Sequence, residues 1–109
     1  MLDNIKNPEE LLNFMDSITY GWVDKDGNKY IDNMDEWYEK CCVQDGEEVL
    51  KSRVGTCWDQ TELERLWFSN NNYNFSTIFI WFSADYKNDY PTHSFLIYED
   101  NSKWYWFEN

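Results

Sequence analysis

The stretch GTCWDQTELERLW, residues 55–67, joins a helix-start signal to an apolar helical stripe. Thr56 stands at the expected N-cap, and Asp59 three residues later completes a capping box. The apolar residues that follow recur at helical spacing: Leu63, Leu66 and Trp67. The sequence therefore predicts a helix from about Cys57 to Ser69, with a cysteine at its first position.

Before this stretch, the sequence predicts two further helices and a hairpin. NPEELLNFMDS, residues 7–17, places Asn7 at an N-cap and Pro8 at the first helical position. Asp26-Gly27 separates two alternating segments, which predicts a hairpin turn. MDEWYEKCC, residues 34–42, has apolar residues at helical spacing, so Cys41 is expected to face the core.

After residue 70 the pattern changes from helical to strand-like. FSTIFIWFS, residues 75–83, is apolar on both alternating faces, as in a central strand. HSFLIYED (93–100) and KWYWFEN (103–109) predict two more strands joined by a tight turn. Helices followed by an antiparallel meander predict one α+β domain over residues 1–109, with the helix that begins at Cys57 packed on the sheet.

Composition restricts the classes of partner. The chain has 109 residues, of which 21 are acidic and nine basic, giving a net charge of −12. Such a charge repels nucleic acids and anionic membrane surfaces, so neither is expected as a direct partner. The sequence shows no signal peptide, no apolar run that spans a bilayer, and three cysteines without a disulfide framework, which favours a cytoplasmic protein. No zinc-type ligand spacing occurs, so neither a metal nor a cofactor is expected.

Two residues carry the candidate chemistry. At the first position of a helix, unpaired N–H groups and the helix dipole favour a thiolate and lower the pKa of Cys57. The same N–H groups can stabilise the oxyanion that forms when a thiolate attacks an acyl carbon. His93, the chain's one histidine, opens a strand 36 residues later and can act as the base. A third group, Glu108 or Asn109 on the next strand, can orient the imidazole.

These segments resemble the cysteine, histidine and acidic blocks of the transglutaminase-like superfamily, which is related in fold to papain-like cysteine proteases. Gly55, Cys57 and Trp58 match the Gly-x-Cys-Trp block, and His93 matches the histidine that opens a strand. The resemblance covers about residues 47–109. It implies a transglutaminase-like core, either minimal or cut short at its C-terminus, because family members commonly have further strands beyond the third residue.

The third residue departs from the family, whose aspartate is replaced here by Glu108 or Asn109. Strand alternation places Glu108 on the face of Trp104 and Trp106, and Glu108 takes the acidic position of the block, so Glu108 is favoured. A one-residue bulge would bring Asn109 to the histidine instead. Trp58 either lines the acyl pocket, as a substrate-binding residue, or packs against the sheet.

Two functions from different classes follow. The first is thiol-dependent acyl transfer or amide hydrolysis on a protein or peptide substrate, with Cys57 as nucleophile and His93 as proton carrier. The second is a non-catalytic acidic interaction protein, such as a DNA mimic, which the charge of −12 and the small size favour. The sequence does not distinguish protease, amidase and transglutaminase chemistry.

Overall fold

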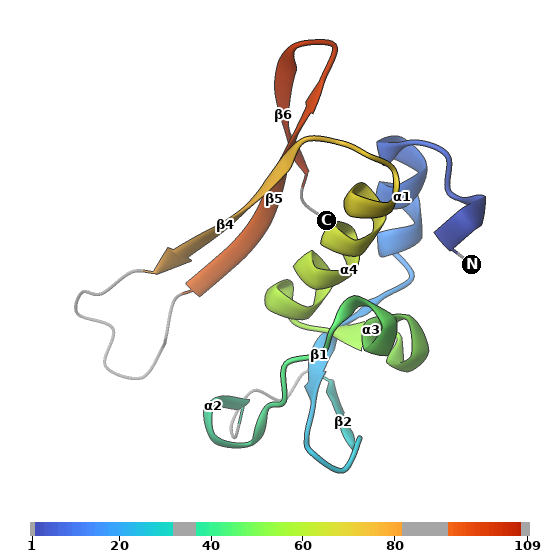
Figure 1. Ribbon diagram of the computed structural model, residues 1–109. Helices are drawn as coiled ribbons and strands as arrows, with labels where there is room; N and C mark the ends of the chain where they lie inside the picture. Colours follow the sequence, from blue (N-terminus) through green and yellow to red (C-terminus); the bar gives the residue numbers. More distant parts are fainter. Residues whose placement is uncertain (1, 32–36, 82–91, 108–109) are drawn as a thin grey trace.

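The computed structural model describes residues 2–31, 37–81 and 92–107 (Figure 1). The chain begins with a 3-10 turn, η1 (Leu2–Asn4), and a helix, α1 (Pro8–Met15). The predicted cap of α1 is confirmed, because the Asn7 side chain accepts a hydrogen bond from the Glu10 N–H at 2.8 Å. Leu11 and Met15 are buried on one side of this helix, where they join the core.

A small three-stranded sheet follows, with strand order β2-β1-β3. Its strands are β1 (Thr19–Val23), β2 (Lys29–Ile31) and β3 (Val54–Gly55). The predicted turn at Asp26-Gly27 joins β1 to β2, and Gly27 takes the positive φ of 83°. The parallel pairing of β1 with β3 was not predicted. A glycine is required at position 21, because a Cβ there would lie 2.5 Å from the Tyr30 carbonyl oxygen.

Two short helices lie between β2 and β3. They are α2 (Trp37–Lys40) and α3 (Gly46–Ser52). Helix α2 lies within the helix predicted over residues 34–42, and residues 34–36 lie outside the described residues. Cys41, expected to face a core, is half-buried.

The central helix, α4 (Cys57–Asn70), has the predicted bounds to within one residue. It packs against a second sheet with strand order β4-β5-β6. The strands are β4 (Phe75–Trp81), β5 (Thr92–Asp100) and β6 (Lys103–Phe107). All of their pairings are antiparallel, which confirms the predicted meander and the α+β class. Among the described residues β5 is the central strand and β4 an edge strand, so the central position expected for residues 75–83 was wrong.

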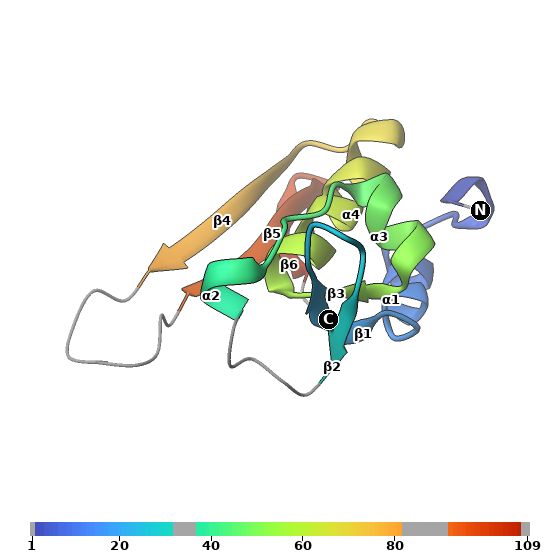
Figure 2. The same cartoon turned by 90° about the horizontal axis from the view of Figure 1, so that it is seen from below.

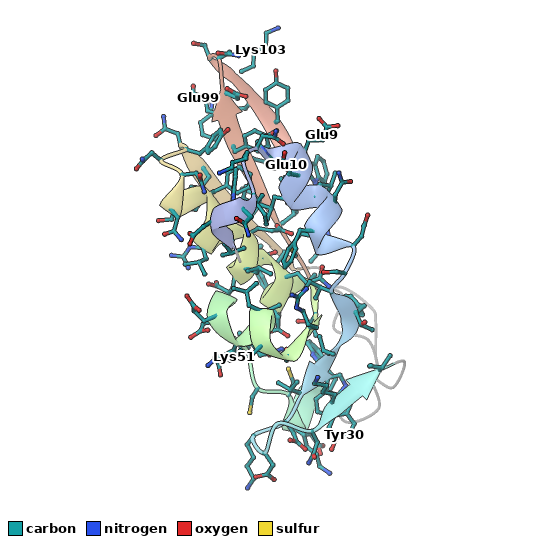
Figure 3. The ribbon with its side chains drawn as sticks, turned by 90° about the vertical axis from the view of Figure 1, so that its right-hand side faces the viewer. Glu9, Glu10, Tyr30, Lys51, Glu99 and Lys103 are labelled. Atoms are coloured by element: carbon teal, nitrogen blue, oxygen red, sulfur yellow. The ribbon has the colours of Figure 1, made fainter. Side chains whose placement is uncertain are left out.

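The core forms where α4 meets α1, α3 and the β4–β6 sheet (Figures 1 and 2). Leu63, Trp67 and Phe68 of α4 are fully buried, and each such side chain contributes about 1.5–3 kcal/mol. The Trp67 Nε1–H donates to the Ile5 carbonyl at 3.2 Å and ties the N-terminal segment to α4. The β5–β6 hairpin, with Glu99 and Lys103, and the β1–β2 sheet, with Tyr30, lie at opposite ends of the molecule (Figure 3). Helix α4 contacts strands of both sheets.

Candidate active site at the start of helix α4

The first turn of α4 is fixed by its capping residues. Thr56 is the N-cap, and its side chain accepts a hydrogen bond from the Asp59 N–H at 3.4 Å. The Asp59 carboxylate in turn accepts from the Thr56 N–H at 3.0 Å, which completes the predicted capping box. Gly55 allows the close approach of β3 to this turn, since a Cβ there would lie 2.9 Å from the Asp59 Cβ. The chain therefore enters α4 in one defined direction.

Asp59 also anchors the loop before α3. Its carboxylate, which is fully buried, accepts from the Gln44 N–H at 2.8 Å and from the Thr56 hydroxyl at 3.2 Å. The Gln44 amide then donates to the Val54 carbonyl of β3 at 2.7 Å. Burial raises the pKa of Asp59, and the hydrogen bonds from Gln44 and Thr56 act in the opposite direction. This buried network supports the turn that carries Cys57.

Cys57 occupies the first position of α4, as predicted, and is half-buried. Its backbone carbonyl accepts a hydrogen bond from the Thr61 hydroxyl at 2.7 Å. Burial raises the pKa of the thiol above its ordinary value, and hydrogen bonding, first from the Ser94 and Trp58 backbone, lowers it only in part. The lowered pKa expected from the helix start is therefore wrong, because desolvation is the larger effect.

His93 is adjacent in the chain to Ser94, whose backbone is among the groups that lower the pKa of Cys57. The two neighbours face opposite sides of the sheet, because side chains alternate along a strand. Ser94 is paired with Phe79, whose ring lies 5.4 Å from the ring of Trp58 on α4. The His93 ring lies 5.7 Å from that of Phe95, on the other face. The structure thus brings the backbone beside His93 to the cysteine and directs the imidazole away from α4.

The remaining predicted site residues are Trp58, Glu108 and Asn109. The Trp58 ring packs between those of Trp37, at 5.6 Å, and Phe79, at 5.4 Å, so a packing role is observed. Its indole Nε1 is buried and has no hydrogen-bond partner in the part of the chain that the structure describes. Glu108 and Asn109 lie outside the described residues, and their roles stay predictions.

No protein-family model, curated protein or solved structure matches this chain. The likeness to the transglutaminase-like superfamily consequently rests on the sequence blocks alone. Within residues 2–31, 37–81 and 92–107, no group of three or more His, Cys, Asp or Glu side chains is placed to hold a metal ion. Over the same ranges, every helix is too short or too polar to cross a membrane.

Sequence reasoning missed the parallel pairing of β1 with β3, which brings Tyr20 beside Gly55, two residues before Cys57. Strand β3 has two residues, so no pattern in the sequence signals this pairing.

Proposed function

We propose that the protein carries out thiol-dependent acyl transfer or hydrolysis on amide groups of proteins or peptides, with Cys57 as nucleophile. The observation that supports this most directly is the position of Cys57, half-buried at the first residue of α4 behind the Thr56–Asp59 capping box. The N–H groups at a helix start stabilise negative charge on sulfur and can also stabilise an acyl oxyanion.

The reaction begins when a base removes the thiol proton. The sulfur then forms a bond to the amide carbonyl carbon, and the carbonyl π electrons move to oxygen. Collapse of this oxyanion expels ammonia or an amine, which takes up the proton, and water or a second amine cleaves the thioester. Because burial raises the pKa of Cys57, the attack depends on the base more strongly than it would for a preformed thiolate.

His93 is the proposed base, as the chain's one histidine and the residue next to Ser94. Its ring shares the face of Phe95, so transfer of the proton requires the start of β5 to turn the imidazole towards α4. The third member remains Glu108 or Asn109. We further propose that the domain has a transglutaminase-like core, in which a cysteine, a histidine and an acidic residue act together.

The test uses a glutamine-containing peptide with and without a fluorescent primary amine. Ammonia release, amine incorporation and peptide cleavage are followed by mass spectrometry, and the acyl-enzyme is trapped by acid quench. We expect Cys57→Ala to abolish all products and the adduct, and His93→Ala to reduce both. Cys42→Ala is the matched control and should retain activity. Products that persist in Cys57→Ala would contradict the proposal.

Two further variants assign the third residue. Glu108→Gln should lower turnover by about two to four orders of magnitude, as loss of an imidazole-orienting group can. Asn109→Ala should then have little effect. The reverse pattern would transfer the role to Asn109.

The alternative, an acidic interaction protein that mimics DNA, predicts different behaviour. Its binding to a basic partner should weaken as salt rises and should not change in Cys57→Ala. Salt-sensitive displacement of DNA from such a partner, without any Cys57 chemistry, would favour this function instead.

A further inference from the structure

The sheet of β4, β5 and β6 has one face against α4 and one face turned away from it. The Phe68 ring of α4 lies 4.9 Å from that of Tyr98 and 5.3 Å from that of Phe107, so these residues face the helix. Because side chains alternate along a strand, Phe95 and Trp106 belong to the opposite face. Helices α1, α3 and α4 lie together on one side of this sheet (Figure 1), so none of them covers that face.

Two tryptophans are exposed on the face away from α4. Trp106 is 64% exposed and Trp104 is 53% exposed. The Trp106 ring stacks on that of Phe95, with centroids 4.6 Å apart and an angle of 18° between the planes, and so helps to bury Phe95. Ile78 pairs with Phe95, and Ile97 pairs with Trp106. These five residues form what we call the aromatic face, and contiguous exposed apolar surface of this kind marks an interaction site.

The charges around the aromatic face favour a cationic partner. Glu99 lies opposite Trp104, and its carboxylate accepts from the neutral Asn74 amide at 3.0 Å, a contact that leaves its charge unbalanced. Among the described residues of β4, β5 and β6, Lys103 is the one Lys or Arg, and alternation places it on the other face, paired with Asp100. The net charge of −12 attracts basic proteins and repels a second copy of this chain.

The spacing of the two tryptophans matches that of an extended peptide. Trp104 and Trp106 are alternate residues of β6, so they lie about 7 Å apart along the strand, and alternate residues of an extended segment have the same separation. The face of an indole ring attracts cations, and the planar guanidinium of arginine stacks on it. Arginine at alternate positions of such a segment therefore fits both rings.

We propose that the aromatic face binds a basic partner protein through an extended segment that carries arginine at alternate positions, with one guanidinium over each exposed indole. The carboxylate of Glu99 pairs with the arginine that lies over Trp104. The aromatic face lies on the side of the sheet away from α4, so this proposal is independent of any chemistry at Cys57.

The probe is a short capped peptide of glycine and serine with arginine at two alternate positions. It is titrated into the ¹⁵N-labelled protein at low salt, and the indole N–H resonances are followed by NMR. We expect the resonances of Trp104 and Trp106 to move together with the peptide concentration. The same peptide with uncharged citrulline in place of arginine should bind about tenfold more weakly, because the cation is lost.

Three variants locate the binding surface. Trp104→Ala should weaken binding of the arginine peptide about two- to fivefold, since one stacked cation is lost. Glu99→Gln should weaken it about twofold, as loss of an exposed ion pair does. Tyr105→Ala is the matched control: it removes a ring that is 44% exposed from the other face of the same strand, so binding should be unchanged. Thermal unfolding of each variant fixes a temperature at which all are folded.

Three results would overturn the proposal. Equal peptide affinity in the parent, Trp104→Ala and Tyr105→Ala would show attraction to the net charge alone. Binding of a linear glucose oligosaccharide that requires Trp104, without binding of the arginine peptide, would assign the aromatic face to carbohydrate. A dimer of the parent in sedimentation equilibrium that Trp104→Ala dissociates would assign it to a second copy of the chain.

Discussion

Cys41 and Cys57 are both half-buried free thiols, but different causes act on their pKa values. Burial raises the pKa of Cys41 to about 11, with further contributions from the charges of Asp59 and Cys42 and an opposing hydrogen bond from Trp37. Burial also raises the pKa of Cys57, but every other main contribution there is a hydrogen-bond donor that lowers it. From this difference we expect Cys57 to be the more reactive thiol, because hydrogen bonding to sulfur favours the thiolate and neighbouring negative charge disfavours it.

Asp59 links the two regions and gives the largest expected effect. Asp59→Ala removes the acceptor of the Gln44 and Thr56 donors and should lower the free energy of unfolding by about 2–4 kcal/mol, because buried donors are left unsatisfied. Urea unfolding measures this loss. A change below about 0.5 kcal/mol would show that the network does not hold the first turn of α4.

Asp59→Asn tests whether the charge of Asp59 raises the pKa of Cys41. The change removes a charge that raises the pKa of Cys41, so Cys41 should be alkylated roughly three- to tenfold faster. Labelling rates in the parent and the variant, at a temperature where both are folded, measure the effect. An unchanged Cys41 rate would contradict the contribution of Asp59 to its raised pKa.

Thr56→Ala should affect only the region of Cys57. Loss of an N-cap costs about 1 kcal/mol, and the fraying is confined to the first turn of α4. Amide hydrogen exchange of residues 57–60 should quicken. Asn7→Ala, which removes the cap of α1, is the matched control: a similar loss of stability is expected, with no change in exchange at residues 57–60. Equal effects of both variants on α4 would contradict a local role for Thr56.

The smallest effect concerns the β1–β2 turn, next to the Cys41 region. Burial acts to raise the pKa of Asp24, but hydrogen bonds from Asn28, Tyr30 and Asp26 outweigh it and lower the value to about 2. A lowered folded-state pKa stabilises the fold above the ordinary carboxyl pKa, and this contribution is lost as pH falls towards about 2. The urea midpoint of the parent should therefore fall more than that of Asp24→Asn between pH 5 and pH 2.5. An equal fall of the urea midpoint in the parent and in Asp24→Asn would contradict the lowered pKa of Asp24.

Local signals in the sequence predicted α1 and α4 and their N-caps correctly. Thr56 with Asp59, and Asn7 with Pro8, specify helix starts through side chains a few residues apart, so the bounds of α4 and the start of α1 could be predicted. Alternation of apolar residues likewise predicted the strands of the second sheet.

Long-range pairing could not be predicted in the same way. Strand β3 has two residues and no pattern of its own, so its parallel pairing with β1, which places Tyr20 beside Gly55, had no local signal. The side of the sheet on which His93 lies depends on register, because a shift of one residue reverses every side chain. The sequence located the cysteine and the histidine, but the register decides which way the imidazole faces.

The most direct test of the central claim is the ratio of the alkylation rates of Cys57 and Cys41. The measurement uses the Cys42→Ser variant, so that peptide mapping reads Cys41 without its neighbour, at pH 8 with limiting iodoacetamide. If donors at the sulfur distinguish the two sites, Cys57 should react about tenfold or more faster, because alkylation follows the thiolate fraction. A Cys41 rate equal to or above that of Cys57 would contradict the account and remove the case for a nucleophile at the start of α4.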